Sequence, residues 1–367
     1  MKKILYIGDA ASPHLARWVV LTHSRGFEVT VFSFRKPAPE IAELSGVKYE
    51  IYEGVESISS SSLLHKFSYL RAYPTLRRVA NRFRPDIVHA HYASSYGLLA
   101  SLLSFHPLII SAWGSDVFSF GDSFVGRMIL RYNFSKADCI LSTSEVMKMR
   151  VKNFTQKEVT VTPFGVNTKL FTPGKEDCPF FEDADIIFGM VKTMQHIYGV
   201  DIVLRAFKLA VDCFPNIKLR LLLVGGGDAD NAFRTLADGL GVSNKVYFTG
   251  RISQSEVPRY HRMIDVFLNP SRSESFGVSV LEAMACGRPV IVSNTGGLAE
   301  IVDDLQYGVL CDPNSVDSLL DKMIRLIENP ELAEKTGRNA RLHVERKFEK
   351  SATDELVLTT YTQLLNK

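Results

Sequence analysis

Cysteine is scarce in this 367-residue sequence, and no Cys-x-x-Cys pair occurs. The five cysteines are Cys139, Cys178, Cys213, Cys286 and Cys311. An odd number of scattered cysteines is not typical of a disulfide framework or of a structural zinc site. The sequence therefore predicts a protein of a reducing compartment, and the cytoplasm is the expected location.

Long apolar runs are also missing. The most apolar stretch, residues 98–112, is interrupted by serines, a histidine and a proline, which argues against a bilayer-spanning helix there. The two N-terminal lysines precede an apolar run at residues 4–7, which is shorter than the hydrophobic region of a signal peptide. We expect no membrane span, and at most a peripheral contact with the inner face of a membrane.

Neither sign of charge dominates, since the formal net charge is +3. Residues 1–150 nevertheless carry 18 Lys and Arg against 12 Asp and Glu, whereas the remaining residues carry 25 against 28. The basic first half favours an anionic partner or a membrane surface, although a mildly basic solvated face explains it equally well. No nucleic-acid partner is expected.

Residues 63–83 mix cations with apolar residues, and Pro74 interrupts the segment. Such a basic amphipathic segment can lie on anionic lipid, and it can equally be a solvated helix of a globular domain. Its cations are Lys66, Arg71, Arg77, Arg78 and Arg82. This segment is the expected site of any peripheral membrane contact.

Tandem repeats and low-complexity tracts are absent, and short apolar runs alternate with helix-length segments instead. The runs lie at residues 4–7, 29–32, 87–89, 108–110 and 139–142, and then at 186–190, 219–224, 246–249, 266–268 and 289–292. Short continuous apolar strands separated by helices are typical of parallel sheets covered on both faces. Two such series predict an α/β protein with two doubly wound domains.

The most informative stretch is residues 269–301, where seven residues separate Glu274 from Glu282. Strand-type runs flank it, so Glu274 is expected in a strand-to-helix loop and Glu282 inside the following helix. A helix N-terminus attracts anions, and Glu282 can lean back toward it. A carboxylate beside an anion is costly unless it binds hydroxyls, so the pattern predicts a nucleotide-sugar ligand. An ordinary βαβ unit would not explain an acid inside the apolar run 280–285.

This stretch resembles the signature of glycosyltransferase family 4, whose members are retaining enzymes of the GT-B fold. The resemblance rests on Pro270, Ser271, Glu274, Phe276, Gly277, Leu281, Glu282, Ala283, Gly287, Pro289, Val290, Gly296 and Gly297. It implies two Rossmann-like domains that face a cleft, with the donor bound by the second. It also implies a first domain at residues 1–167, closed by the family-like segment 163–167, and a second at 180–350. Turn-forming and charged residues at 165–180 suit a linker, and a helix near 351–367 is expected to pack back on the first domain.

By the same resemblance, Glu274 holds the sugar and opposes positive charge on the anomeric carbon, Lys192 binds the diphosphate, and Glu282 binds ribose hydroxyls. The expected donor-binding residues are Gly225, Gly226, Arg251, Ile252, Ser275, Phe276, Gly277, Val278 and Glu282. The sequence departs from the family in having Lys192 in place of an Arg and Tyr198 in place of a Lys. One phosphate-binding cation is therefore missing, and Arg17 of the first domain is a candidate replacement.

The first domain should supply the acceptor side, through Asp9, His14 and Arg17 after the first strand and Trp113 after a later one. Relatives carry a His where Trp113 stands, so His91 or Asp116 is expected to substitute as a catalytic group. His89, two positions before His91 on the same strand, should instead be a core histidine with its hydrogen bonds satisfied.

No metal or other cofactor is expected. Asp-x-Asp occurs at residues 183–185 and 228–230, but the pattern arises by chance in a chain with this many acids, and a helix start explains one copy. The predicted activity is retaining transfer of a hexose-type sugar, with a UDP-sugar as the expected donor, to a hydroxyl of a sugar or lipid-linked acceptor. By analogy with the family, the product belongs to cell-surface polysaccharide or glycolipid assembly. A nucleotide-sugar epimerase of the same fold and a non-catalytic sugar- or lipid-binding relative are the alternatives.

Overall fold

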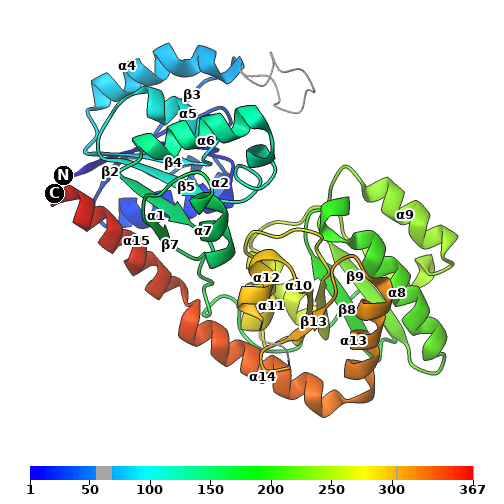
Figure 1. Cartoon of the computed structure of the whole chain (residues 1–367). Helices are drawn as coiled ribbons and strands as arrows, with labels where there is room; N and C mark the ends of the chain where they lie inside the picture. Colours follow the sequence, from blue (N-terminus) through cyan, green and yellow to red (C-terminus); the bar gives the residue numbers. More distant parts are fainter. Residues whose placement is uncertain (55–67, 303–304, 367) are drawn as a thin grey trace. The chain divides into compact units, whose positions relative to one another are not determined.

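The structure, a computed structural model, describes residues 1–54, 68–302 and 305–366 of the chain. It divides into two compact units (Figure 1). Unit 1 comprises Met1–Thr162 and Asp354–Lys367, and unit 2 comprises Pro163–Thr353. The segment 165–180, which the sequence suggested as a linker, thus belongs to unit 2.

The described part of unit 1 contains one parallel sheet. Its strands are β1 (Lys3–Ile7), β2 (Glu28–Ser33), β3 (Lys48–Ile51), β4 (Ile87–His91), β5 (Leu108–Ala112), β6 (Cys139–Ser142) and β7 (Val159–Val161). They run in the order β3-β2-β1-β4-β5-β6-β7, so the chain moves outward from β1 in one direction and then from β4 in the other. This order creates a topological switch point between β1 and β4, where an open α/β sheet binds ligands.

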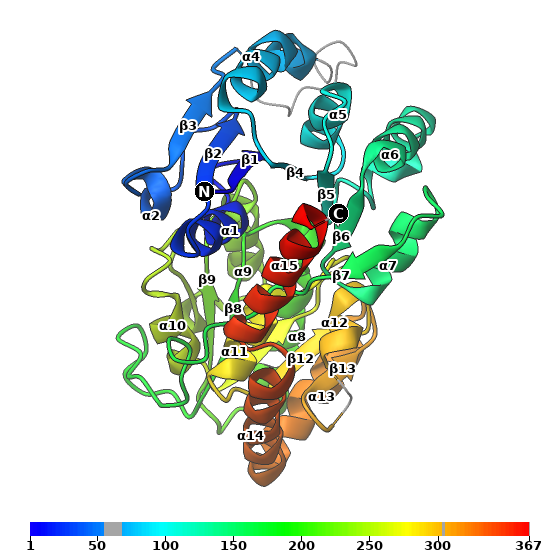
Figure 2. The same cartoon turned by 90° about the vertical axis from the view of Figure 1, so that its left-hand side faces the viewer.

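Helices cover both faces of this sheet (Figures 1 and 2). They are α1 (Pro13–Ser24), α2 (Pro39–Ala42), α4 (Tyr73–Phe83), α5 (Ser95–Leu102), α6 (Phe124–Lys136), α7 (Glu145–Lys152) and α15 (Lys350–Leu365), with 3-10 turns η1 (Ser68–Ala72) and η2 (Phe120–Asp122). Side chains alternate along each strand. Leu5 and Ile7 therefore pack with the layer that contains α4, α5 and α6, whereas Ile4 and Tyr6 pack with α1 and α15.

A buried polar network attaches α15 to the sheet of unit 1. The Tyr361 hydroxyl lies 2.6 Å from His89 Nδ1 and 3.0 Å from the Tyr6 hydroxyl. His89 Nε2 lies 2.7 Å from Ser111 Oγ, so both nitrogens of this fully buried ring are hydrogen-bonded. This confirms the prediction that His89 is a satisfied core histidine, and it shows why the last helix returns to the first unit.

Unit 2 repeats the same winding in its described part. Its strands are β8 (Ile186–Val191), β9 (Leu219–Val224), β10 (Val246–Phe248), β11 (Val266–Asn269), β12 (Val290–Ser293) and β13 (Val309–Cys311), in the order β10-β9-β8-β11-β12-β13. All pairings are parallel. The switch point of this sheet lies between β8 and β11.

The helices of unit 2 again form two layers. They are α8 (Val200–Cys213), α9 (Asp230–Gly239), α10 (Val257–Met263), α11 (Val278–Ala285), α12 (Gly296–Ile301), α13 (Val316–Glu328) and α14 (Pro330–Lys347), with 3-10 turns η3 (His196–Tyr198) and η4 (Ser243–Lys245). Buried residues of α8, α9 and α13 form one core with the sheet. Helix α11 packs against α14 and α10.

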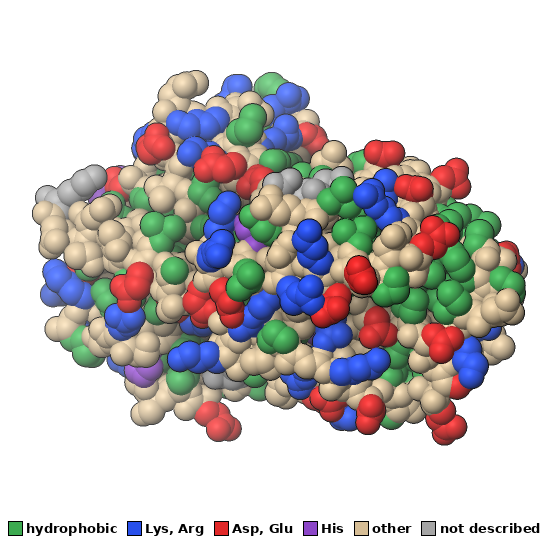
Figure 3. Space-filling model, turned by 90° about the horizontal axis from the view of Figure 1, so that it is seen from below, with side chains coloured by type: hydrophobic (Ala, Val, Ile, Leu, Met, Phe, Trp, Pro, Cys, Tyr) green, Lys and Arg blue, Asp and Glu red, His purple; other side chains and the backbone are tan. Residues whose placement is uncertain are grey.

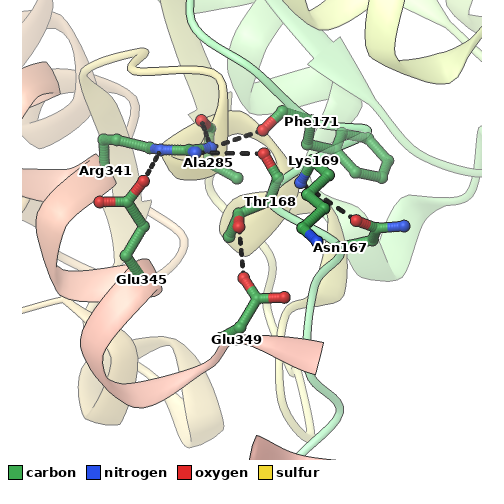
Figure 4. A network of polar contacts seen from close by, with 8 residues as sticks. All are labelled: Asn167, Thr168, Lys169, Phe171, Ala285, Arg341, Glu345 and Glu349. Atoms are coloured by element: carbon green, nitrogen blue, oxygen red, sulfur yellow. Dashed lines mark hydrogen bonds and ion pairs between the residues drawn. The ribbon is translucent and has the colours of Figure 1, made fainter. Parts of the chain in front are cut away.

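Arg341 on α14 holds the first residues of unit 2 in place (Figure 4). Its guanidinium donates to the carbonyl oxygens of Phe171 and Ala285, at 2.6 Å each, and to that of Thr168 at 3.1 Å. Its Nε also donates to Glu345 at 2.7 Å. Several charge-assisted hydrogen bonds to one segment fix it against α11 and α14, which explains why residues 168–171 do not act as a free linker.

Helix α4 settles part of the expectation for residues 63–83, of which 63–67 lie outside the described residues. Its apolar side chains Leu76, Val79 and Phe83 are buried in the core of unit 1. The apolar face of α4 is therefore not available to lipid, and this part of the segment is a solvated helix.

No helix in the described ranges is long and apolar enough to cross a bilayer. On the face drawn in Figure 3, cations and carboxylates are interspersed rather than separated by sign.

Candidate active site

The switch point of unit 2 brings together the loops that follow β8 and β11. Lys192 is the first residue after β8, and Glu274 lies in the loop between β11 and α11. Both strands end at the same edge of the sheet because they are parallel neighbours. Residues separated by 82 positions in the sequence thus meet at one place.

Lys192 and Glu274 form a tight ion pair at this edge. Lys192 Nζ lies 2.5 Å from Glu274 Oε2, and the two side chains are only 17% and 11% exposed. The ammonium also lies over the ring of Tyr198, 4.4 Å from its centroid. Tyr198, at the position where the resembled family has a second cation, therefore supplies an aromatic face against the ammonium of Lys192.

Two glycines shape the loop that carries Glu274. Gly297 N donates to the carbonyl oxygen of Glu274 at 3.0 Å. Gly296 has φ +52°, and a Cβ on it would lie 2.0 Å from the same oxygen. The loop before α12 is thus in direct backbone contact with the Glu274 loop, and this close approach requires glycine.

Replacing Gly296 by alanine is therefore expected to displace Glu274. A displacement of about 1 Å at a catalytic group lowers turnover by roughly 100-fold. The matched control is Gly241→Ala, because Gly241 also has positive φ, +70°, but no atom lies within 4 Å of a Cβ placed there. We expect kcat, measured at saturating donor, to fall in Gly296→Ala and to stay near the wild-type value in Gly241→Ala. Equal effects of the two substitutions would show that backbone strain alone is responsible.

Arg272 joins the two loops of the site, a role that no sequence pattern predicted. Its guanidinium donates to both oxygens of Asp201, at 2.9 and 2.8 Å, and its Nε donates to Asn314 Oδ1 at 3.0 Å. The Arg272 side chain thus holds Asp201 at the start of α8. The backbone N–H of Arg272 donates to the carbonyl oxygen of Ile197 at 2.8 Å. A bidentate pair fixes relative orientation, so Arg272 positions the Lys192–Tyr198 loop against the Glu274 loop.

The N-terminus of α11 follows directly after Glu274. Gly277 precedes the first helical residue, Val278, and adopts φ +109°. Phe276 is buried between Phe164 and Phe348, which anchors the turn. The backbone N–H groups at this end of a helix favour an anion. Ser275 lies in the same turn and is half-buried.

Glu282 lies on α11, with its side chain 12% exposed. Its Oε2 is 3.5 Å from Nε2 of His261 on α10, a histidine that is fully buried. Neither ring nitrogen of His261 has a hydrogen-bond partner among the described residues. His261 was not predicted from the sequence, because a His in a short polar helix carries no distinctive pattern.

The glycine-rich turn after β9 forms the remaining part of the site in unit 2. Gly225 has φ +127°, its N–H donates to Gly250 O at 3.1 Å, and a Cβ on it would lie 2.0 Å from the carbonyl oxygen of Lys192. The side chain of Arg251 lies against Gly226, where a Cβ would be 2.9 Å from Arg251 Cγ. Ile252 follows and is half-buried. The structure thus brings the predicted donor-binding segments next to Lys192.

In unit 1, the residues at the end of β4 lie inside a cluster of aromatic rings. The ring centroid of His91 is 4.7 Å from that of Trp113, 5.1 Å from that of Trp18 and 5.4 Å from that of Tyr6. His91 is fully buried, neither of its ring nitrogens has a hydrogen-bond partner among the described residues, and burial holds its pKa well below the ordinary value. A catalytic role for His91 stays a prediction, since its ring does not reach solvent.

Asp116 organises the loops after β4 and β5. Its carboxylate is fully buried and accepts hydrogen bonds from the backbone N–H groups of Ala93 at 2.6 Å, Gly114 at 2.7 Å and Trp113 at 3.2 Å. Burial raises its pKa to about 6, although these hydrogen bonds oppose the shift. The geometry makes Asp116 a residue that positions Trp113, and a direct catalytic role stays a prediction.

The other residues predicted for the acceptor side lie near the end of β1. Asp9 accepts from Ala11 N at 2.9 Å and pairs with Arg35 at 3.1 Å. His14 packs against Trp113, with ring centroids 5.7 Å apart. Arg17 pairs with Asp354 on α15 at 3.2 Å, so its charge is already partnered within unit 1. This pairing counts against Arg17 as the missing phosphate-binding cation.

The Asp-x-Asp pairs make structural contacts or begin a helix. Asp183 pairs with Arg220 at 2.6 Å, and Asp185 accepts from Lys218 N at 2.7 Å. Asp230 is the first residue of α9. Across residues 1–54, 68–302 and 305–366, no group of three or more His, Cys, Asp or Glu is arranged to hold a metal ion.

Comparisons with known proteins bear on both units. A family model described as "Glycosyl transferases group 1" matches residues 178–343, and one described as "Glycosyl transferase 4-like" matches residues 3–144. An uncharacterized glycosyltransferase of Methanocaldococcus jannaschii is 28% identical over 306 residues, which are 80% of this chain and 82% of that protein.

Two solved structures are similar over the whole chain. Sucrose-phosphate synthase from Thermosynechococcus elongatus has a TM-score of 0.85 at 20% identity and covers 100% of both chains. HepE of Anabaena, solved in complex with UDP-glucose, has a TM-score of 0.80 at 18% identity and covers 99% of this chain and 100% of that one. At these identities the similarity establishes the fold. With the family matches and the two doubly wound sheets, it follows that the chain belongs to the GT-B glycosyltransferases of the family 4-like type.

Proposed function

We propose that the protein transfers a hexose-type sugar from a UDP-sugar to a hydroxyl group, with retention of the anomeric configuration. The observation that carries the proposal is the Lys192–Glu274 pair, held at 2.5 Å beside the N-terminus of α11. The positive charge of Lys192 suits the diphosphate of the donor. The negative charge of Glu274 suits a sugar ring that becomes positive as the donor bond breaks. The UDP-glucose bound by HepE, a protein of the same fold, supports the choice of nucleotide.

The charges of the site match the charges of the reaction. As the bond between the anomeric carbon and the diphosphate oxygen breaks, negative charge grows on the leaving group and positive charge grows on the sugar. The ammonium of Lys192 and the N–H groups of Gly277 and Val278 would stabilise the leaving diphosphate. The carboxylate of Glu274 would bind sugar hydroxyls and oppose the positive charge. Preorganised groups of both signs stabilise the transition state more than the ground state.

The proton of the acceptor hydroxyl has to be removed during transfer. In a front-face reaction, the acceptor oxygen forms its bond to the anomeric carbon on the side that the diphosphate leaves, and the diphosphate oxygen takes the acceptor proton. This route preserves the configuration and needs no protein base. The burial of His91 and Asp116 is consistent with it. We further propose that Glu282 binds the ribose hydroxyls. The base is proposed to lie against Gly225, Gly226, Arg251 and Ile252.

The activity is further proposed to require no metal, because Lys192 and backbone N–H groups replace the charge that a cation would supply. The acceptor is proposed to be a sugar or a lipid-linked sugar of cell-surface polysaccharide or glycolipid assembly. The aromatic surface formed by Trp113 and His14 is suited to stacking on a pyranose ring.

Donor choice and stereochemistry are tested together. A thermal-shift screen with UDP-, GDP- and ADP-sugars should show the largest stabilisation with a UDP-sugar, since a ligand that binds only the native state raises its melting temperature. The product formed with a panel of sugar acceptors should keep the anomeric configuration of the donor, read from its NMR coupling constant. EDTA should leave the rate unchanged. An inverted product, donor isomerised without an acceptor, or activity lost to EDTA and restored by manganese would each contradict the corresponding part of the proposal.

A further inference from the structure

Helix α6 carries large apolar side chains on the side that faces solvent. Phe124 is 72% exposed, Met128 57%, Val125 43% and Tyr132 38%. Positions i, i+1, i+4 and i+8 of a helix lie within a single arc of its surface. We call these four residues the α6 ridge. A surface helix normally presents polar residues there, so the ridge points to a partner.

The opposite side of α6 packs against the core of unit 1. Leu130 and Phe134 are buried in the core of unit 1, and the Asn133 amide donates to the carbonyl oxygens of Ala93 and Ser94. At the N-terminus, the Ser123 hydroxyl accepts from Gly126 N at 2.9 Å. Buried residues on the other side of α6 therefore anchor the helix, whereas all four ridge residues keep more than a third of their surface exposed.

Cations flank the ridge on both sides. Arg127 and Arg131 fall on one flank and Lys136 on the other, and the sequence of α6 contains no Asp or Glu. None of these three forms an ion pair with a carboxylate in the described ranges. The acids that border the helix are already engaged, since Asp122 pairs with Arg150 and Asp138 with His106.

A fourth cation extends this basic surface. Lys157 Nζ donates to the carbonyl oxygens of Ser135 and Ala137, at 2.7 and 2.6 Å, at the C-terminal end of α6. The helix thus presents an apolar stripe inside a rim of positive charge. Apolar residues that enter the boundary between headgroups and acyl chains, with basic residues at the phosphates, characterise interfacial helices.

We propose that the α6 ridge docks the protein on a membrane surface that contains anionic lipid. Phe124 and Met128 enter the lipid boundary, and the flanking cations contact the headgroup phosphates. Charge decides against a second copy of the chain as the occupant, because two ridges face to face would bring together cations with no carboxylate between them. The proposal replaces the α4 part of the segment, residues 73–83, as the site of peripheral contact, since the apolar side chains of α4 are buried.

The test is co-sedimentation of the full chain with vesicles of phosphatidylcholine alone and with vesicles in which phosphatidylglycerol replaces part of it. We expect binding to the anionic vesicles, weakened by added salt. Phe124→Glu with Met128→Glu should lower the vesicle partition coefficient about tenfold or more. Arg127→Gln with Arg131→Gln should lower it by about fivefold for each charge removed.

Leu342→Glu is the matched control, because Leu342 is also an exposed apolar residue of a helix, 48% exposed on α14 of unit 2. It should bind vesicles like the wild type, and so should Glu274→Gln, so the outcome does not depend on the proposed transferase chemistry. Equal binding to both kinds of vesicle, or unchanged binding of both the Phe124→Glu with Met128→Glu variant and the arginine variant, would overturn the proposal. A dimer in sedimentation equilibrium that Phe124→Glu with Met128→Glu dissociates would also overturn it, in favour of self-association. The arginine variant keeps the test decisive if the apolar variant does not fold.

Discussion

Glu274→Gln is expected to lower kcat by about 1000-fold, roughly 4 kcal/mol of activation free energy, without unfolding unit 2. Glutamine keeps the shape of the side chain but removes the charge that opposes the developing positive charge on the sugar. It also leaves Lys192 without the carboxylate that now lies 2.5 Å from its ammonium. The side chain is only 11% exposed, so water does not readily replace the lost charge.

The expected result separates catalysis from binding. Initial rates should show the loss in kcat, whereas the donor dissociation constant, measured by calorimetry, should change little. Glu282→Gln should show the opposite pattern, with a donor KM raised about tenfold and a nearly normal kcat. Glu328→Gln, at an exposed position on α13, is the matched control for the loss of one carboxylate. Wild-type turnover by Glu274→Gln would contradict the catalytic role.

Most strands of the described fold were predictable from short apolar runs, and the three missed strands all lie at sheet edges, although the fourth edge strand, β10, was predicted. β3 and β7 are the two edges of the sheet in unit 1, and β13 is one edge of the sheet in unit 2. An edge strand pairs with a neighbour on one side only and is less fully covered. β3 is accordingly half exposed and mixes polar with apolar residues, and β7 and β13 are only three residues long. β3 and β7 contain no continuous apolar run, and β13 is an apolar run of only three residues.

The sequence predicted those residues of the site that lie close together along the chain. Glu274, Gly277 and Glu282 lie within one strand–loop–helix unit, so their spacing placed them correctly on the fold. The contacts that orient them join distant parts of the sequence. The Arg272–Asp201 pair spans 71 positions, and the His261–Glu282 contact joins two helices whose packing only the tertiary structure shows. Likewise, the position of His91 at the end of a strand does not reveal that aromatic rings cover it.

Unit 1 is expected to lose stability steeply as the pH falls from about 6.5 to about 3. Burial lowers the pKa of His89 from 6.5 to about 3, and burial also lowers the pKa of His91. At these two imidazoles the folded state binds fewer protons than the unfolded state within this window, which lowers the free energy of unfolding as the pH falls. The raised pKa of Asp116, about 6, opposes this trend at a single carboxyl. Each pKa unit between the two states corresponds to about 1.4 kcal/mol, so the shift of His89 alone amounts to several kcal/mol.

Both tryptophans of the chain, Trp18 and Trp113, lie in unit 1, so denaturation followed by tryptophan fluorescence reports this unit. His89→Gln should lower stability near neutral pH, because it disturbs the bonds to Tyr361 and Ser111, but its stability should fall less steeply on acidification. Ser111→Ala is the control, since it removes one of these hydrogen bonds and keeps the titrating ring. It should be less stable than the wild type at neutral pH and keep the steep dependence. If His89→Gln is as sensitive to acid as the wild type, the buried imidazole is not what couples folding of unit 1 to pH.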